Sequence, residues 1–218
     1  MAELVDPAAE RYASEHTTAF EGAIGAAASW TKGNTSSPGM MAGVAEARLL
    51  EALVVSSRAM QVLEIGTFTG VGTLSLAAAL PPGGRVTTLE IDEDTAAVAQ
   101  RHIAASPHAD RIELIIGDAK ETLRRLNGPF DLVWMDAWKA DYPAYYELVV
   151  GKLAPNGIIA ADNLFRGGGA LDPASGDPGN QGIRTFARQV QDDTRMHNVL
   201  LTIGDGVMLA WRRPDEQP

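Results

Sequence analysis

Short apolar runs alternate with longer helical segments from about residue 60 to the end of the chain. The runs stop at Gly, Pro, Asp or Asn, a pattern typical of strands buried inside a sheet. We expect strands at 61–65, 85–91, 111–116, 130–135, 158–161, 199–203 and 207–211, and helices at 73–80, 92–105, 120–126, 143–153 and 183–192. Alternation at this spacing predicts a parallel sheet with right-handed crossovers and helices on both faces.

The last two apolar runs depart from this pattern, because Gly204-Asp205-Gly206 separates them instead of a helix. An Asp-Gly pair between two apolar runs favours a β-hairpin. The predicted fold is therefore an α/β, Rossmann-like, doubly wound sheet of seven mostly parallel strands with an antiparallel C-terminal hairpin edge.

The length of the chain suits one domain, which we expect to span residues 1–218. Its cofactor-binding core is predicted at 60–212, and residues 1–45 are predicted to form a helical N-terminal cap. Residues 167–182 are rich in Gly, Pro, Asp and Ser, so we expect a long loop without regular structure. Such a loop is either a lid over a site or a tolerated surface insertion.

Composition narrows the class of function. The chain contains no cysteine, which excludes disulfides, thiolate zinc sites and cysteine nucleophiles. Its formal net charge of −10 disfavours nucleic-acid binding, which needs basic surface to neutralise phosphates. No apolar run approaches the length of a membrane span, and no secretory signal pattern opens the chain. We therefore expect a cytoplasmic protein that acts on small molecules, without nucleic-acid or membrane partners.

Two predicted strands end in side chains that can bind a cation. One is followed by Asp136, Trp138 and Lys139, and the next by Asp162 and Asn163. The carboxyl ends of parallel strands meet at one edge of an open sheet, where ligands bind. Hard cations such as Mg²⁺ prefer oxygen ligands, so Asp136, Asp162 and Asn163 are predicted to form one metal site. The alternative is that each acid merely caps the helix that follows it.

The other side chains of these strand ends allow two interpretations each. Lys139, one helical turn from Asp136, is either a general base or a solvated surface lysine. Trp138 either packs in the core or stacks on a flat ligand ring. The histidines show no metal-binding spacing, and His102 and His108 are expected at the surface.

The first strands end in acids beside a glycine turn. Glu64 precedes Gly66-Thr67-Phe68-Thr69-Gly70, whose spacing differs from the Gly-x-Gly-x-x-Gly of dinucleotide sites. Glu64 would repel a pyrophosphate and attract a cationic amino group, although the segment can also be a purely structural turn. Glu90 can accept hydrogen bonds from ribose hydroxyls or cap the next helix. Asp118 can accept from an adenine amino group, cap a helix, or do both.

Together these motifs make the chain resemble the cation-dependent, S-adenosylmethionine-dependent O-methyltransferases, which include the caffeoyl-CoA and catechol O-methyltransferases. The likeness covers roughly residues 38–212 and is carried by the segments 62–70, 130–136, 142–147, 161–163 and 203–206. Asp136, Trp138 and Lys139 are similar to the Asp-x-Trp-Lys arrangement of the catechol enzymes, whereas the plant group usually has Asp in place of that Trp.

The resemblance implies methyl transfer from S-adenosylmethionine to a hydroxyl of a catechol-type or other phenolic molecule, and a homodimer. It implies that Asp136, Asp162 and Asn163 bind Mg²⁺ or another divalent cation, and that Lys139 is the general base. The cofactor contacts that it implies come from Glu64, Gly66, Thr67, Glu90, Asp118, Ala119, Asp136 and Trp138, with Glu64 and Gly66 at the methionine part, Glu90 at the ribose and Asp118 and Ala119 at the adenine.

Some positions depart from the family pattern. Val71-Gly72 replaces a frequent Tyr-Ser, so a serine contact to the cofactor carboxylate is lost or passes to Thr73. Ala42 stands where a Ser or Thr is expected. Arg166 replaces a substrate-binding Asn of the plant enzymes, so the plant substrate contacts do not transfer.

Two other functions stay open. A nicotinamide-dependent oxidoreductase could use a similar sheet, but the missing Gly-x-Gly-x-x-Gly and the presence of Glu64 disfavour it. A non-catalytic regulator that binds S-adenosylmethionine is disfavoured by the predicted metal set and by Lys139.

Overall fold

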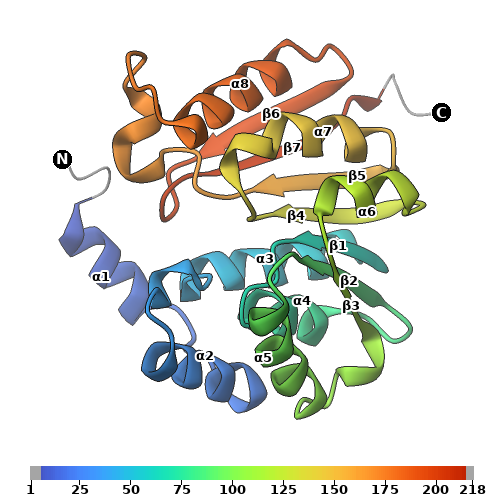
Figure 1. The fold of residues 1–218 in the computed structure, drawn as a ribbon. Helices are drawn as coiled ribbons and strands as arrows, with labels where there is room; N and C mark the ends of the chain where they lie inside the picture. The colour runs from blue at the N-terminus through green and yellow to red at the C-terminus, as the bar shows by residue number, and fades with distance from the viewer. Residues whose placement is uncertain (1–5, 215–218) are drawn as a thin grey trace.

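The sheet has seven strands in the order β3-β2-β1-β4-β5-β7-β6 in the computed structural model, which describes residues 6–214 (Figure 1). They are β1 (Gln61–Ile65), β2 (Arg85–Glu90), β3 (Ile112–Ile116), β4 (Phe130–Met135), β5 (Leu153–Ala161), β6 (Met196–Leu201) and β7 (Val207–Arg212). β1 to β5 are parallel, and β7 runs antiparallel between β5 and β6. The predicted fold class is confirmed, while the outer ends of the predicted domain, 1–5 and 215–218, lie outside the described residues.

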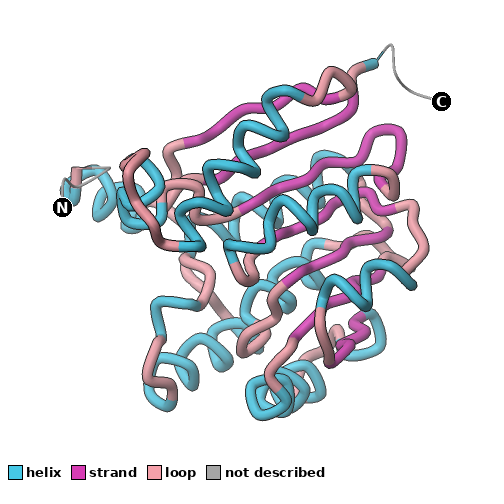
Figure 2. Tube along the Cα trace, turned by 45° about the horizontal axis from the view of Figure 1, so that its top comes forward, coloured by secondary structure: helices cyan, strands magenta, loops and turns pink. Residues whose placement is uncertain are grey.

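Helices lie on both faces of the sheet. They are α1 (Pro7–Glu15), α2 (Gly22–Asn34), α3 (Val44–Ser57), α4 (Val71–Ala79), α5 (Glu93–Ala104), α6 (Ala119–Arg125), α7 (Tyr142–Val150) and α8 (Pro178–Asp192), with 3-10 turns η1 (Pro38–Met40), η2 (Ala109–Arg111), η3 (Lys139–Asp141) and η4 (Arg166–Leu171). α6, α7 and α8 cover one face, and α3, α4 and α5 cover the other, with α2 packed against α4 (Figure 2). No described helix is long and apolar enough to cross a membrane.

Alternating side chains of the central strands fill both layers of the core. In β4, Val133 and Met135 pack in the cluster that contains residues of α7 and α8. Leu132 and Trp134 pack in the opposite cluster, with residues of α3 and α4. Because neighbouring side chains of a strand point to opposite faces, a strand covered on both sides is apolar over its buried part, as β4 is from Leu132 to Met135. This explains why β4 has the bounds that its apolar run predicts.

The segment after β5 is more regular than its composition predicts. α8 begins at Pro178, well before the predicted residue 183, and η4 occupies Arg166–Leu171. The Asp177 side chain accepts a hydrogen bond from the backbone N–H of Asn180 at 2.8 Å and caps α8, with Pro178 in the first turn. The expectation of an unstructured loop over 167–182 is therefore wrong from Pro178 onward, where Asp177 and Pro178 start a helix. At the other end, the left-handed backbone of Gly167 and Gly168 interrupts η4.

The connection between β6 and β7 is longer than the predicted Gly204–Gly206 turn, since β6 ends at Leu201 and β7 begins at Val207. This connection lies against the segment that follows β5. The backbone N–H of Leu164 donates to the carbonyl of Gly206, and that of Phe165 donates to the carbonyl of Asp205, both at 2.9 Å. The connection is thereby held over the carboxyl end of β5.

Candidate active site

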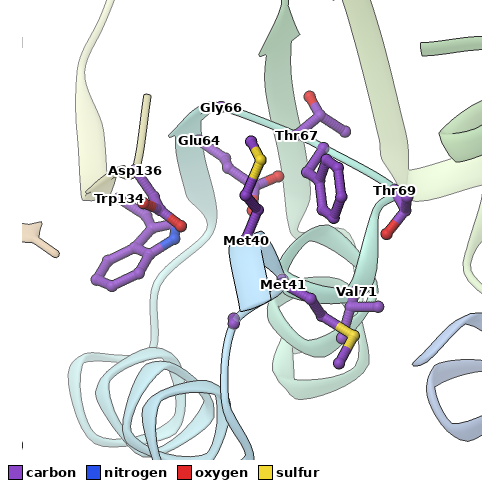
Figure 3. Close-up of a pocket in the computed structure, with 12 residues that line it drawn as sticks. Met40, Met41, Glu64, Gly66, Thr67, Thr69, Val71, Trp134 and Asp136 are labelled. Atoms are coloured by element: carbon purple, nitrogen blue, oxygen red, sulfur yellow. The ribbon is translucent and has the colours of Figure 1, made fainter. Parts of the chain in front are cut away.

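A cleft of about 1160 Å³ opens where the central strands end. The predicted residues Gly66, Glu90, Asp118, Ala119, Asp136, Trp138, Lys139, Asp162 and Asn163 line it. Glu64 and Thr67 line a small adjoining cavity that also borders Gly66 and Asp136 (Figure 3). The fold thus brings all the predicted residues to one opening.

Glu64 is buried at the end of β1. Its Oε2 accepts hydrogen bonds from the hydroxyls of Thr73 and Thr88, the latter at 2.6 Å. Thr88 faces Glu64 in the parallel β1–β2 register and also accepts a hydrogen bond of 2.6 Å from the Thr67 hydroxyl. Burial raises the pKa of Glu64 to about 8, although the threonine hydrogen bonds oppose this shift. A cationic ligand group beside this carboxylate would keep it ionised.

Glycines let the turn after β1 approach its neighbours. Gly66 has a φ of 103°, and a Cβ at this position would overlap the carbonyl oxygen of Asp136. The backbone N–H of Asp136 in turn donates to the carbonyl of Ile65 at 2.8 Å. A Cβ at Gly72 would lie 2.7 Å from Glu64 Oε1, so a side chain at this position would require Glu64 to shift. The ends of β1 and β4 therefore touch, which joins the predicted cofactor and metal residues.

Glu90 and Asp118 both accept hydrogen bonds from backbone N–H groups. Glu90 accepts from Phe68 at 2.8 Å through Oε2 and from Ile91 at 2.9 Å through Oε1. Asp118 accepts from Lys120 at 2.7 Å through Oδ1 and caps α6. The capping role of Asp118 is confirmed, and the ribose role of Glu90 and the adenine role of Asp118 stay predictions.

Asp136 and Asp162 follow the neighbouring parallel strands β4 and β5, whose last residues pair. Asp162 is only 3% exposed, and its Oδ1 accepts the backbone N–H of Asn163 at 2.6 Å. Burial and the charges of Asp136 and Glu46 raise the pKa of Asp162 to about 8. Three carboxylates thus surround the ammonium of Lys139, and a bound cation would replace the protons that burial favours on them.

This set of donors fits a hard divalent cation. Two carboxylates and the amide oxygen of Asn163 are all oxygen ligands, and Mg²⁺ keeps several of its waters. Among residues 6–214, no group of three or more His, Cys, Asp or Glu side chains is placed to hold an ion. Asn163, which lines the same cleft and has a left-handed backbone with a φ of 59°, is the third member of the predicted set. The metal role of these three residues stays a prediction.

Lys139 is buried in η3 and is not a solvated surface lysine. Its Nζ donates to Asp136 Oδ1 at 2.6 Å and to the Tyr142 hydroxyl at 2.9 Å. The Tyr142 hydroxyl donates to the carbonyl of Met135 at 2.8 Å. Behind them, a Cβ at Gly182 would overlap the carbonyl of Lys139, so α8 packs closely on η3. The lysine ammonium is thus fixed between a carboxylate and a phenol.

The aromatic and histidine side chains near the cleft differ from two expectations. Trp138 is 62% exposed at the cleft, so core packing is wrong for it, and stacking on a ligand stays a prediction. His102 is half-buried instead of lying at the surface, and its Nδ1 donates to the Thr69 carbonyl at 2.8 Å. Its ring also packs edge-on against Trp30 of α2. His108 is likewise half-buried.

Three residues of the site were missed as functional candidates. Tyr142 lies three residues after Lys139, a spacing that places both on one face of a helical turn. Thr88 lies two residues before Glu90 and could have been found from the strand register opposite Glu64. Glu46 lines the cleft from α3, and no signal in the sequence relates it to β5.

Comparison with known proteins agrees with this geometry. The O-methyltransferase family model matches residues 23–213. A catechol O-methyltransferase of Niastella koreensis is 34% identical over 76% of this chain and 79% of its own length. The O-methyltransferase TomG of Streptomyces achromogenes, solved in complex with SAM, has 29% identity and a TM-score of 0.88 over 97% of this chain and 99% of its own. An O-methyltransferase of Bacillus cereus, solved in complex with SAH, has 31% identity and a TM-score of 0.87 over 94% of this chain and 97% of its own. The chain therefore belongs to the O-methyltransferase family, as its strand-end motifs predict.

Proposed function

We propose that this protein transfers the methyl group of S-adenosylmethionine to a hydroxyl of a catechol-type molecule in a reaction that depends on Mg²⁺ or another divalent cation. The observation that carries the proposal is the group of Asp136, Asp162 and Lys139, of which Asp162 and Lys139 are buried. Lys139 Nζ lies 2.6 Å from the Asp136 carboxylate, and the backbone carbonyl of Asp136 lies close to Gly66 at the border of the Glu64 cavity. A methyl donor and an acceptor hydroxyl bound on either side of this contact would lie next to each other.

The cofactor half of the proposal is supported by relatives and by chemistry. Two similar structures were solved in complex with SAM and with SAH. In this chain, Glu64 offers a buried carboxylate to the amino group of the methionine part, since its partners are neutral threonine hydroxyls. Glu90 and Asp118 line the same cleft farther along, where they would accept hydrogen bonds from ribose and adenine.

The acceptor half rests on oxygen ligands and a base. Asp136, Asp162 and Asn163 would hold the cation, which when bound lowers the pKa of an acceptor hydroxyl and orients two adjacent oxygens. Lys139 would accept the proton of the reacting hydroxyl on Nζ. The acceptor oxygen forms a bond to the methyl carbon while the bond from that carbon to sulfur breaks, which leaves S-adenosylhomocysteine and a methyl ether. Holding oxygen and methyl in near-attack geometry supplies much of the acceleration.

The test is methyl transfer to a panel of catechols and matched monophenols, measured with and without Mg²⁺ after treatment with EDTA. We expect catechols to be methylated and monophenols not to be. Methylation of the catechols should stop in EDTA and resume when Mg²⁺ is added. Undiminished turnover in EDTA-treated protein contradicts the metal-assisted reaction. Binding of S-adenosylhomocysteine, measured by calorimetry in the same samples, shows whether the cofactor site is intact. The homodimer and the cytoplasmic location stay predictions, and light scattering would measure the oligomeric state.

A further inference from the structure

The cleft is strongly acidic around two basic side chains. Among the described residues that line it, eight carry carboxylates: Glu46, Glu90, Asp92, Asp118, Asp136, Asp141, Asp162 and Asp205. The basic residues of that lining are Lys139 and Arg166. Lys139 is bonded to Asp136. Across residues 6–214, Arg166 pairs only with Asp177, which lies outside this lining, so it is the cation of the lining that can meet an anionic part of a ligand.

Arg166 is fixed beside the predicted metal residues. It lies three positions after Asn163, and its backbone N–H donates to the Asn163 carbonyl at 3.2 Å. Its backbone is left-handed, with a φ of 48°, which an arginine adopts only where its surroundings compensate. The next residue supplies part of this compensation, because the Gly167 N–H donates to Asp205 Oδ1 at 2.7 Å.

Two hydrogen bonds hold one edge of the Arg166 guanidinium in place. Nε donates to Asn180 Oδ1 at 2.9 Å, and Nη2 donates to Asp177 Oδ1 at 3.2 Å. Within the described part of the chain, Nη1 has no such partner, and 28% of the side chain is exposed. Asp177 is 47% exposed, so solvent screens this ion pair and it contributes little. A planar group with a free edge suits the two oxygens of a carboxylate.

Two glycines keep the space that this arrangement needs. A Cβ at Gly179 would lie 2.5 Å from Nη1 of Arg166, and a Cβ at Gly169 would lie 2.6 Å from Nδ2 of Asn180. Gly179 lies inside α8 and has no left-handed backbone, so its conformation does not require glycine. Glycine is needed there because a Cβ would collide with the guanidinium of Arg166.

We propose that Arg166 binds a carboxylate carried by the aromatic acceptor, so that the preferred substrates are dihydroxy aromatic acids. The inference rests on the proposed function, because the acceptor hydroxyls must lie at Asp136, Asp162 and Asn163 for Arg166 to reach the other end of the molecule. The acidic lining repels the carboxylate everywhere else, so Arg166 also sets which way round the acceptor binds.

The first experiment compares acids with their methyl esters, which keep the dihydroxy ring and lose the charge. The pairs are 3,4-dihydroxybenzoate, 3,4-dihydroxyphenylacetate and 3,4-dihydroxycinnamate with their esters, which vary the distance from ring to carboxylate. For the acid whose spacer lets its carboxylate reach Arg166, we expect kcat/KM to exceed that of its ester roughly tenfold or more. Esters that react as well as acids at every length overturn the inference.

Three variants then locate the preference. Arg166→Met should reduce the ratio of acid to ester toward one. Gly179→Ala should reduce it as well, because it displaces the guanidinium and keeps its charge, and alanine is well tolerated in a helix. Arg184→Met is the matched control, since Arg184 donates to the carbonyls of Asp172 and Ser175 in the same segment and lies outside the cleft lining. An unchanged ratio in Arg166→Met, or an equal fall in Arg184→Met, overturns the assignment.

The esters separate this inference from the proposed function. If esters and acids react equally and depend on Mg²⁺, catechol methylation stands and the role of Arg166 fails. If neither member of any pair reacts although S-adenosylhomocysteine binds, the proposed function itself fails and the inference falls with it.

Discussion

The two halves of the cleft hold their acidic groups in different ways. In the β1–β2 half, Glu64 and Glu90 accept hydrogen bonds from threonine hydroxyls and backbone N–H groups. In the β4–β5 half, the carboxylates of Asp136 and Asp162 repel each other, and both are attracted to the ammonium of Lys139. The acids of the first half are hydrogen-bonded by neutral donors, whereas the buried carboxylates of the second half hold protons that an added cation would replace.

This difference indicates that the β1–β2 half binds the cofactor and that the β4–β5 half carries out the reaction. Groups already fixed by neutral donors position a ligand without changing during a reaction, so their loss should weaken binding. Groups that share a proton or a cation take part in the step itself, so their loss should lower kcat. Substitutions in the β1–β2 half should therefore change affinity for the cofactor, and substitutions in the β4–β5 half should change turnover.

The largest effect should come from the base. Lys139→Met removes the proton acceptor next to Asp136, and we expect kcat to fall by about 10² to 10⁴. The affinity for S-adenosylhomocysteine should change little, because Lys139 lies in the β4–β5 half. Rapid-quench methyl transfer and calorimetry measure the two quantities, with Lys32→Met on the exposed side of α2 as the control. Equal losses of binding and turnover would show that the two halves are not separate.

The β4–β5 half, which contains Lys139, is also the easier half to predict from the sequence. Asp136 and Asp162 each follow an apolar run directly, and parallel strands bring such positions together whatever the helices between them do. Tyr142 was not inferred as a partner of Lys139, because its role depends on where η3 turns and on the carbonyls of Met135 and Asp162. Local pattern therefore predicts which residues reach the edge of the sheet, and packing decides which of them touch.

The next effect should be on cofactor affinity. Glu64→Gln removes the negative charge but keeps the shape of the side chain, so the affinity for S-adenosylhomocysteine should fall about tenfold to a hundredfold. The wild type should also bind more tightly as the pH rises toward 8, because the ligand amino group needs Glu64 ionised and its pKa is raised to about 8. The variant should lose this pH dependence. Calorimetry from pH 6 to pH 9 without metal tests both, and a variant that keeps the wild-type slope contradicts the assignment.

Glu64→Gln, which should weaken cofactor binding, should at the same time stabilise the fold at high pH. The folded chain holds a proton on Glu64 that the unfolded chain releases above pH 4.5, so the free energy of unfolding falls as pH rises through this window and up to about 8. Glu64→Gln removes that loss, on the order of 5 kcal/mol before any relaxation of the site. Thermal melts should show the variant to be more stable than the wild type at pH 9 and little different at pH 5. A variant that is less stable at pH 9 would mean that the carboxylate stabilises the fold.

A smaller effect on turnover should come from the phenol that holds the base. Tyr142→Phe removes the hydroxyl that accepts from Lys139 and donates to Met135, and we expect kcat to fall about tenfold. The affinity for S-adenosylhomocysteine should stay near that of the wild type. Tyr146→Phe is the control, because Tyr146 donates to Asp193 away from the cleft. If both variants lose the same activity and the same thermal stability, Tyr142 only packs the core.

The N-terminal cap shows where inference from sequence ends. Residues 1–45 were predicted to be helical, and α1 and α2 agree with this over the described part. No local pattern predicts that α2 contacts the glycine turn, because the hydrogen bond joins Thr31 and Thr69 across 38 positions of the chain. Threonine in a helix usually bonds its own backbone, and Thr31 does so with Ala27, which hides its second role.

The smallest effect should come from breaking this contact. The Thr31 hydroxyl donates to the Ala27 carbonyl at 2.8 Å, so the hydrogen bond of 2.7 Å to Thr69 must be donated by Thr69. Thr31→Val leaves the buried Thr69 hydroxyl without its acceptor, at a cost of about 1 kcal/mol. If α2 positions the glycine turn, KM for S-adenosylmethionine should rise about fivefold with kcat unchanged, and Thr31→Ser should restore it. A lower kcat with an unchanged KM would instead assign this turn to the reacting half of the cleft and break the division between the two halves.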